Sequence, residues 1–585
     1  MIFEKLNDEQ KNVVMARGNL LLKACPGSGK TRVIIHKIVH EINMLGEHSR
    51  RKIAAVTFTM RAAEEIVRRL STYDINKDRV WAGTLHSFCI EWILKPYSFL
   101  IDDLKNGFSI ADENYCLTVL NNLKEKYGLD SFLSISTKLD VNGRYIQSNV
   151  PLKLFNEYET ILKKDKYIDF DRVIYLSVNL LNNNPQIGLI ISKIFSRICV
   201  DEYQDTQDLL YVLINKIVKA GNGNTNIMYV GDPDQSIYGS LGGKAKDLNE
   251  LKCEISPLEI GELSIVGNYR SSQKIIDFFS LFQSTKRSIQ AIGNNSLINN
   301  SIISYSNNIH FNMVSQEVAR LVKFNLSLGI PENEICILVP QWSMIRNIRI
   351  ELKELLPSVG FDSENLSESS ILRNNIWFKI TRLILVKPSP KIYNSRIRWA
   401  KEVIDLLVDQ TEGNLDDYFL KPRNILHTIN SIECDELNVI PFINHCFDRF
   451  LEKINIDITF FSELDKNKKN YLSQLHQNYK DKPISYLCDI YKEKTGIVIS
   501  SCAGAKGEEF ETVIVFGLLE GYIPHWQEIF SQNGQEASKK MLYVIASRAK
   551  RNLHLISEKG RLTQRGSPYL PTNALLNLPH TFDLC

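Results

Sequence analysis

One segment near the N-terminus restricts the possible folds of this chain more than any other. An apolar stretch at residues 19–22 is followed by Ala24, Cys25, Pro26, Gly27, Ser28, Gly29, Lys30 and Thr31, and then by an apolar helical pattern. This strand–loop–helix order is typical of a phosphate-binding loop, because glycines let backbone N–H groups converge on a phosphate at a helix N-terminus. We expect Lys30 to reach the outer phosphate oxygens and the Thr31 hydroxyl to bind Mg²⁺. Ala24 replaces the first glycine of the usual pattern, and a match of this length alone could also be a chance loop.

A second, acidic element follows another apolar stretch. Residues 198–205 read Ile-Cys-Val-Asp-Glu-Tyr-Gln-Asp, which places Asp201 and Glu202 just after a predicted strand. Mg²⁺ prefers carboxylate oxygen, which Asp201 can supply directly or through water. Glu202 could orient or deprotonate an attacking water. A lone Asp-Glu pair is more often a solvated loop, but here it accompanies a phosphate-binding loop.

Short apolar runs alternate with helical patterns near both ends of the chain, as expected for parallel sheets covered by helices. The predicted strands are residues 19–22, 53–56, 198–200 and 227–230 in the first half, and 335–339, 497–499, 513–516 and 553–556 later. They predict an α/β fold with two sheets. Residues of about 90–195 and 375–490 read as mainly helical insertions, and the Asn-rich stretch around 294–300 reads as a linker or surface loop.

Composition narrows the possible partners and surroundings. With 70 Lys and Arg against 67 Asp and Glu in 585 residues, the net charge is only +3, so a polyanion-binding surface would have to be a local groove. The 11 cysteines include no CxxC pair, which fits a reducing cytosol better than a zinc or disulfide framework. We expect a cytoplasmic protein without a membrane span, since no stretch approaches about 18 uncharged apolar residues.

Further segments match a known family in its order. They are residues 6–10, 57–63, 83–88, 231–239, 268–272, 506–510 and 543–549. With the two elements above, they make the chain resemble the UvrD/Rep/PcrA group of superfamily 1A DNA helicases. The resemblance implies two RecA-like lobes: a first lobe (1–90 and 196–285) with a helical insertion (91–195), and a second lobe (286–375 and 491–585) with a reduced helical insertion (376–490).

The resemblance also implies roles around ATP. Gln10 would read the adenine edge, Arg32 would lie near the base, Tyr269 would stack on it, and Glu509 would contact the ribose side. A glutamine amide suits adenine because it both donates and accepts hydrogen bonds.

Three further residues are implied to act on the γ-phosphate. Gln235 would sense it, while Arg270 and Arg548 would act as arginine fingers delivered by the second lobe. Hydrolysis would then accompany closure of the two lobes. Without the surrounding segments, a salt-bridged structural role would be favoured for each arginine.

For DNA, the resemblance points to aromatic and polar side chains of the first lobe. Phe58 and Tyr238 would stack on bases, which is a sequence-tolerant contact. The backbone phosphates would be held by Thr59, Arg61, Thr84, His86 and Ser87. Of these, His86 is the weakest assignment, since a lone histidine is more often a core residue.

The chain departs from the family pattern in the segments that track DNA. Ser240 and Leu241 stand where the family has an aromatic residue and an arginine, Ala503 replaces a histidine, and Glu508 replaces a leucine. Lost stacking contacts would weaken grip on the strand by a few kcal/mol in total, at about 1 to 3 kcal/mol each. We therefore predict a weak or partner-dependent helicase.

The sequence thus predicts an ATP- and Mg²⁺-dependent 3′–5′ helicase or translocase acting on single-stranded DNA or on duplex with a single-stranded end. The direction is implied by the resemblance alone. An alternative is a regulatory ATPase that switches a partner nuclease, similar to the compact UvrD-like subunit of Gabija-type anti-phage defence systems. Stimulation of hydrolysis by single-stranded DNA would discriminate the two.

Overall fold

The computed structural model separates into two compact units, residues 1–357 with 498–585, and residues 358–497. It describes residues 4, 6–46, 48–111, 113–130, 133–147, 149–239, 242–298, 300–363, 375–388, 393–480, 482–491, 496–529, 534–563, 566–576 and 578–585. The first unit contains two parallel sheets, and the second is mainly helical.

The first sheet has the strand order β3-β2-β6-β7-β1-β8, with every neighbouring pair parallel. Its strands are β1 (Asn19–Ala24), β2 (Lys52–Thr57), β3 (Val80–Thr84), β6 (Phe195–Asp201), β7 (Asn226–Gly231) and β8 (Ile260–Ile265). The phosphate-binding loop follows β1, the acidic element follows β6, and the segment of Gln235 follows β7. Since these strands are neighbours and parallel, all three elements leave the sheet at the same edge.

Successive side chains of each strand point to opposite faces of this sheet, and both faces are apolar. Helices therefore cover both faces. Along β2, Ala54 and Val56 join one buried cluster, whereas Ile53 and Ala55 join the other. The first cluster includes residues of α4 (Leu85–Cys89), α8 (Phe170–Asn183), α9 (Pro185–Ile194), α10 (Asp208–Gly221) and α11 (Leu248–Ile255). The second includes residues of α1 (Asp8–Met15), α2 (Lys30–Met44) and α3 (Met60–Leu70).

The segment between β3 and β6 is mainly helical, as predicted for residues 90–195. After α4 it continues through a π-helical turn (Ile90–Leu94), α5 (Lys95–Tyr97), α6 (Glu113–Lys126) and α7 (Leu152–Lys164) to α8 and α9. Within this segment, β4 (Ser109–Ile110) and β5 (Tyr167–Ile168) form a two-stranded parallel pair. Residues of α6 and α7 form a separate small core around Phe155 and Tyr158.

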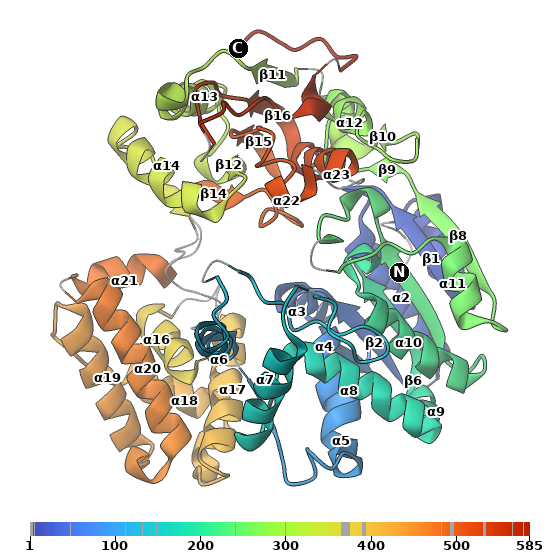
Figure 1. Ribbon diagram of the computed structural model, residues 1–585, viewed down its shortest axis with the longest axis vertical. Helices are drawn as coiled ribbons and strands as arrows, with labels where there is room; N and C mark the ends of the chain where they lie inside the picture. The colour runs from blue at the N-terminus through green and yellow to red at the C-terminus, as the bar shows by residue number, and fades with distance from the viewer. Residues whose placement is uncertain are drawn as a thin grey trace. The chain divides into compact units, whose positions relative to one another are not determined.

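The second sheet contains the adjacent parallel strands β11-β16-β15-β12-β14. Their bounds are β11 (Ile302–Ser306), β12 (Ile335–Val339), β14 (Ile497–Ser501), β15 (Phe510–Val515) and β16 (Ala549–Ile556). Helices α13 (Val314–Ser327) and α14 (Trp342–Leu355) lie on one side of it, and α12 (Gln273–Ser280) and α23 (Gly534–Ala546) on the other (Figure 1). A short helix, α22 (Trp526–Ile529), precedes α23.

Packing divides the two lobes earlier than the expected boundary after residue 285. Ile275, Phe278 and Phe279 of α12 lie in the buried cluster of the second sheet, not in those of the first. A two-stranded pair, β9 (Gly267–Asn268) and β10 (Gln290–Ala291), flanks this helix in the chain. We infer that the change of lobe comes just after β8.

The unit of residues 358–497 has its own helical core, around Trp377, Phe447 and Tyr471. Its helices are α16 (Ile376–Leu385), α17 (Tyr393–Gln410), α18 (Pro422–Asn430), α19 (Val439–Lys453), α20 (Ser462–Tyr479) and α21 (Ile484–Tyr491), and a short strand, β13 (Phe361–Ser363), precedes them. This agrees with the helical pattern of residues 376–490.

The predicted α/β class with two sheets is confirmed, and each of the eight predicted strands is present. Strands β3, β8 and β11 carry no such prediction: Gly, Glu or Ser interrupt the apolar residues of β8 and β11, and the apolar part of β3 is limited to Val80, Trp81 and Ala82. The Asn-rich stretch around residue 295 is a 3₁₀-helix (Gly293–Leu297) rather than a plain linker, and Asn299 lies outside the described residues.

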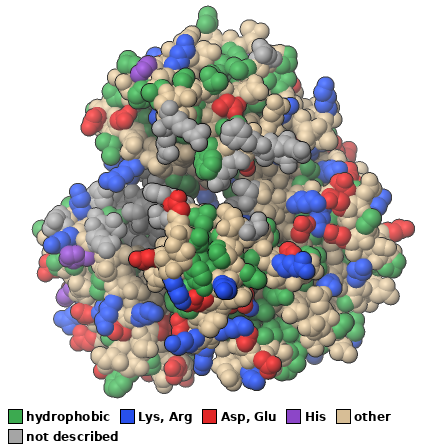
Figure 2. Space-filling view, viewed as in Figure 1, with side chains coloured by type: hydrophobic (Ala, Val, Ile, Leu, Met, Phe, Trp, Pro, Cys, Tyr) green, Lys and Arg blue, Asp and Glu red, His purple; other side chains and the backbone are tan. Residues whose placement is uncertain are grey.

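The charge distribution on the surface and the character of the helices both reflect the composition. Basic and acidic side chains are intermixed on the face shown in Figure 2, in keeping with the small net charge. Among the described helices, none combines the length and the apolar character that crossing a bilayer requires.

Candidate nucleotide and nucleic-acid site

The phosphate-binding loop adopts a conformation that its glycines make possible. Gly27 and Gly29 have φ angles of +68° and +81°, and Gly29 is the residue that caps α2. The Ser28 hydroxyl donates to the Cys25 carbonyl at 2.8 Å, which closes the loop. A Cβ at Gly27 would come within 2.6 Å of the Arg270 Cβ, so only glycine allows this close approach.

Gln10 supports this loop through both ends of its amide. Its Nε2 donates to the Ser28 carbonyl at 2.9 Å, and its Oε1 accepts from the Asn7 N–H at 3.2 Å. The side chain is fully buried. Both hydrogen-bonding atoms that were expected to face adenine are therefore engaged within the protein.

The acidic element brings its carboxylates to the loop. Lys30 Nζ lies 3.7 Å from Glu202 Oε1, and the Glu202 N–H donates to Asp201 Oδ1 at 3.0 Å. Burial, together with the adjacent Glu202 carboxylate, raises the pKa of Asp201. Burial by itself raises the pKa of Glu202 as well, but Lys30 and Lys506 outweigh it and hold that pKa below its ordinary value.

Gln235 is held between the lobes. Its Nε2 donates to Asp232 Oδ2 at 3.0 Å, and its Oε1 accepts from Arg548 Nη2 at 3.1 Å. The Lys506 ammonium, from the second lobe, donates to the Gln235 carbonyl at 2.6 Å and to Asp205 Oδ2 at the same distance. Gln235, the candidate γ-phosphate sensor of the first lobe, is thus in direct contact with residues of the second lobe.

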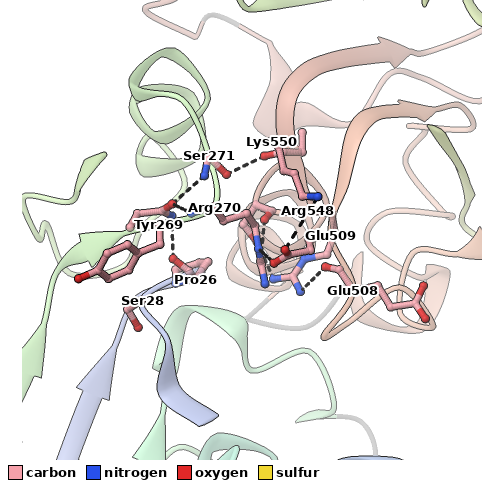
Figure 3. A network of polar contacts seen from close by, with 12 residues as sticks. Pro26, Ser28, Tyr269, Arg270, Ser271, Glu508, Glu509, Arg548 and Lys550 are labelled. Carbon is pink, nitrogen blue, oxygen red and sulfur yellow. Dashed lines mark hydrogen bonds and ion pairs between the residues drawn. The ribbon is translucent and has the colours of Figure 1, made fainter. Parts of the chain in front are cut away.

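Arg548 and Arg270 belong to one network (Figure 3). Arg548 is buried and donates to the carbonyls of Val544 and Glu508, and burial followed by the repulsion of Arg270 lowers its pKa to about 9. Arg270 donates through Nε to Glu509 Oε2 at 2.7 Å. In this structure Glu509, the expected ribose contact, is therefore the partner of an expected arginine finger.

Residues 268–272 join the phosphate-binding loop to the second sheet. The Asn268 amide donates to the Pro26 carbonyl at 2.7 Å, and the Tyr269 N–H donates to the Gly27 carbonyl at 2.9 Å. On the other side, the Ser271 hydroxyl donates to the Ala549 carbonyl at 2.6 Å. Arg270 is consequently placed on a segment that both lobes hold.

The residues expected around the base lie together at the edge of this segment. The guanidinium carbon of Arg32 is 5.7 Å from the centre of the Tyr269 ring, within the range of a cation–π contact. Asn295 donates to the carbonyls of Tyr269 and Arg270, so it holds the backbone that carries the ring. Asn295 belongs to the Asn-rich stretch, whose composition predicts only a linker or surface loop.

Phe58 and Tyr238 stack on one another, with ring centres 5.2 Å apart and an interplanar angle of 21°. Phe58 remains 48% exposed. The Tyr238 hydroxyl donates to the Ala503 carbonyl at 3.4 Å, and Lys506 Nζ lies 5.3 Å from the Tyr238 ring. A cavity of about 290 Å³ lies beside the pair and extends to Glu202.

The polar residues expected to hold DNA phosphates lie at the ends of neighbouring strands. Thr59 caps α3 and Thr84 caps α4, where its side chain also contacts the Ser87 hydroxyl at 2.9 Å. His86 packs edge-on against Phe170, and burial lowers its pKa. The ring is partly buried and lines the cavity beside Phe58.

Arg61 makes a contact between the lobes that the sequence did not suggest. Its Nη1 donates to Glu508 Oε1 at 2.8 Å, while the Arg61 side chain stays 73% exposed. Glu508 is the residue that replaces the leucine of the family pattern. Ser240 and Leu241, the other departures next to Tyr238, lie outside the described residues.

Several charged or polar residues of the site carry no role that the sequence predicts. Lys506, Asp232 and Tyr543 stand inside the matched segments, and this position is the signal that could have found them. Arg287, which binds Asp232 and Asp234, lies outside every matched segment, and no pattern points to it.

Comparisons with known proteins show which family the chain resembles. Residues 6–256 match the UvrD/REP helicase N-terminal domain, and residues 449–560 match the UvrD-like helicase C-terminal domain. The chain is 27% identical to ATP-dependent DNA helicase Rep of Buchnera aphidicola subsp. Acyrthosiphon pisum, over 98% of each chain. It is 25% identical to ATP-dependent DNA helicase PcrA of Bacillus subtilis, over 94% of this chain and 82% of PcrA. A eukaryotic relative, srs2 of Schizosaccharomyces pombe, is 26% identical over 95% of this chain and 72% of its own length.

Proposed function

From the premise that this chain belongs to the UvrD-like family of ATP-hydrolysing DNA helicases, we propose that it moves 3′ to 5′ along single-stranded DNA. Each cycle of ATP hydrolysis would open and close the cleft between its two lobes. The direction rests on the resemblance to the UvrD/Rep/PcrA group.

One observation carries the proposal: the groups suited to ATP hydrolysis come from both lobes and meet at one interface. The first lobe supplies Lys30 and Glu202, which lie 3.7 Å apart. The second lobe supplies Arg548, which donates to Gln235 of the first. In enzymes that use it, guanidinium charge delivered to a transferring phosphoryl group accelerates hydrolysis by about 10³ to 10⁵. A site divided in this way makes hydrolysis depend on the distance between lobes.

Within this site each first-lobe residue has a distinct task. The glycine turn exposes backbone N–H groups to the β-phosphate, and Lys30 adds a fixed positive charge. Glu202, which lies against Lys30, is suited to orient or deprotonate the attacking water.

The same residues fit a divalent cation. Asp201 and Glu202 are adjacent carboxylates in a buried setting, where burial, followed by the Glu202 charge, raises the pKa of Asp201. Thr31 and Asp201 would hold Mg²⁺, which supplies positive charge to the outer phosphates.

For DNA, we propose that the Phe58–Tyr238 pair is the stacking platform of the track. A base would have to enter beside or between the rings, because they now contact each other. The capped N-termini of α3 and α4 fit phosphate groups. Arg61 is engaged by Glu508 through Nη1, and this competition with a phosphate supports weak or partner-dependent unwinding.

The test is ATP turnover of the purified chain with and without single-stranded DNA. Strong stimulation, with faster displacement of streptavidin from the 5′ end of an oligonucleotide than from the 3′ end, would support 3′–5′ movement. ATP turnover that does not respond to DNA would overturn it and favour the alternative of a regulatory ATPase acting on a partner nuclease.

A further inference from the structure

Two buried carboxylates beside Gln235 share a single guanidinium nitrogen. Arg287 Nη2 donates to Asp232 Oδ1 at 2.5 Å and to Asp234 Oδ2 at 2.7 Å. The side chains of Asp232 and Asp234 are 0% and 1% exposed, and that of Arg287 is 13% exposed. A buried charge is tolerated only where it is paired, so these three side chains depend on one another.

This cluster crosses from one lobe to the other. Asp232 and Asp234 follow β7 of the first sheet, whereas Arg287 lies between Phe282 and Ile289, which are both buried in the core of the second. Ser284, in the same connecting segment, donates its N–H to Asp234 Oδ1 at 2.8 Å. The arginine therefore comes from the second lobe.

The other oxygen of Asp232 holds the candidate γ-phosphate sensor. Asp232 Oδ2 accepts from Gln235 Nε2 at 3.0 Å and from the Tyr543 hydroxyl at 3.1 Å. A carboxylate only accepts and a guanidinium only donates. Asp232 and Arg548, at opposite ends of the Gln235 amide, therefore determine which way that amide faces.

Asp232 is also linked to the candidate general base. Its N–H donates to Gln204 Oε1 at 3.1 Å, and Gln204 Nε2 donates to Glu202 Oε2. One residue thus connects Gln235, Glu202 and Arg287. By contrast, the Asp234 carboxylate contacts Ser284 and Arg287, while the Asp234 N–H donates to Asp232 Oδ1 at 3.3 Å.

We propose that Arg287 is a positioning residue for ATP hydrolysis, which holds the Asp232 carboxylate so that Asp232 presents the Gln235 amide to the γ-phosphate. Since Arg287 belongs to the second lobe, the orientation of Gln235 depends on contact between the lobes. The inference deepens the proposed function and rests on its assignment of Gln235.

The decisive comparison is Asp232→Asn against Asp234→Asn. Each removes one carboxylate from Arg287, but only Asp232 contacts Gln235. An asparagine at 232 must present its NH₂ either to Arg287 or to Gln235 and Tyr543, all of which are donors in these contacts. We expect Asp232→Asn to lower kcat at least tenfold with the KM for ATP changed less than threefold, and Asp234→Asn to lower kcat less than threefold.

Arg287 itself is tested by Arg287→Lys and Arg287→Gln. Since one nitrogen makes both contacts, a lysine ammonium can replace it in part, so Lys should keep at least a third of the wild-type kcat while Gln loses tenfold or more. Thermal unfolding of all four variants shows how far each fold is weakened. Equal kcat losses in Asp232→Asn and Asp234→Asn, or in the Lys and Gln variants, would mean that the cluster is only structural and would overturn the proposal.

Measuring turnover with and without single-stranded DNA separates this inference from the proposed function. If the wild-type chain hydrolyses ATP but ignores DNA, the proposed movement along DNA fails. The contrast between the two asparagine variants in basal turnover still decides the role of Arg287.

Discussion

The nucleotide site and the surface around Phe58 and Tyr238 belong to the same pair of lobes but are built differently. In the first, Asp232, Gln235 and Arg548 are buried, and each has several protein partners. In the second, Phe58 is about half exposed and Arg61 is mostly exposed. Charged groups act strongly only where water is excluded and their positions are preorganised, whereas stacking on any base requires only an accessible ring. We therefore expect substitutions to cost less around Phe58 and Tyr238 than among the buried charges of the candidate nucleotide site.

The strongest test of this difference between the two regions is the candidate general base, Glu202. Replacing Glu202 with Gln should lower kcat by about 10² to 10⁴, because the attacking water loses its proton acceptor. ATP affinity should stay within a few-fold, as measured by binding of a fluorescent nucleotide. Glu262→Gln, on β8 of the same sheet, is the matched control and should hydrolyse ATP normally. A collapse of nucleotide affinity in Glu202→Gln would make Glu202 structural.

Lys30 tests the fixed charge of the same site. Lys30→Ala should lower ATP turnover by about 10² to 10³ or more, since the outer phosphates lose a positioned cation. Lys23→Ala removes a lysine from β1 that pairs with Glu262, and it should leave turnover unchanged. Steady-state ATPase assays on both proteins decide this, and normal turnover in Lys30→Ala would contradict the assignment of the loop.

Phe58 tests the exposed region. Phe58→Ala should weaken binding of single-stranded DNA by about 1 to 3 kcal/mol while leaving basal hydrolysis unchanged. Fluorescence anisotropy with a labelled oligonucleotide measures the loss. Phe460→Ala, at an 81% exposed position of the helical unit, is the control for removing a surface ring.

Adding Tyr238→Ala and the Phe58→Ala/Tyr238→Ala double variant makes this DNA-binding test more specific. Because the two rings stack on each other, the losses in the single variants should not sum in the double variant. Equal loss of basal hydrolysis and DNA binding in Phe58→Ala would show that the two regions are not separate.

The smallest expected effect concerns Glu508. Glu508→Leu frees Arg61 for phosphate and should strengthen DNA binding by only about two- to fivefold, because exposed ion pairs contribute little. Titrations at several salt concentrations should also show a steeper salt dependence, as one more phosphate contact is made. Glu65→Gln, which removes a carboxylate paired with Arg68 and Arg69 on α3, controls for the change in net charge. Unchanged affinity and salt dependence would mean that Arg61 does not bind DNA.

Local sequence patterns by themselves determined a large part of this protein. The apolar runs predicted the eight principal strands, and the parallel order explains why the loop after β1 and the carboxylates after β6 meet at one edge. The importance of Gly27 and Gly29 could also be predicted from the sequence, because the need for a positive φ is a property of the local backbone. Strand β8, whose apolar residues are interrupted by Gly261, Glu262 and Ser264, left no comparable signal.

Only the tertiary structure decided which charges meet across the lobes. Arg61 and Glu508 are separated by 447 positions in the chain, and Tyr543 and Asp232 by 311, yet each pair is in hydrogen-bond contact. Arg287 lies in no recognised motif. Its proposed role follows from its contact with Asp232 after β7, although its neighbours in the chain pack in the core of the second sheet. Secondary structure depends on neighbours in sequence, whereas the partner of a buried charge depends on how whole sheets pack against each other.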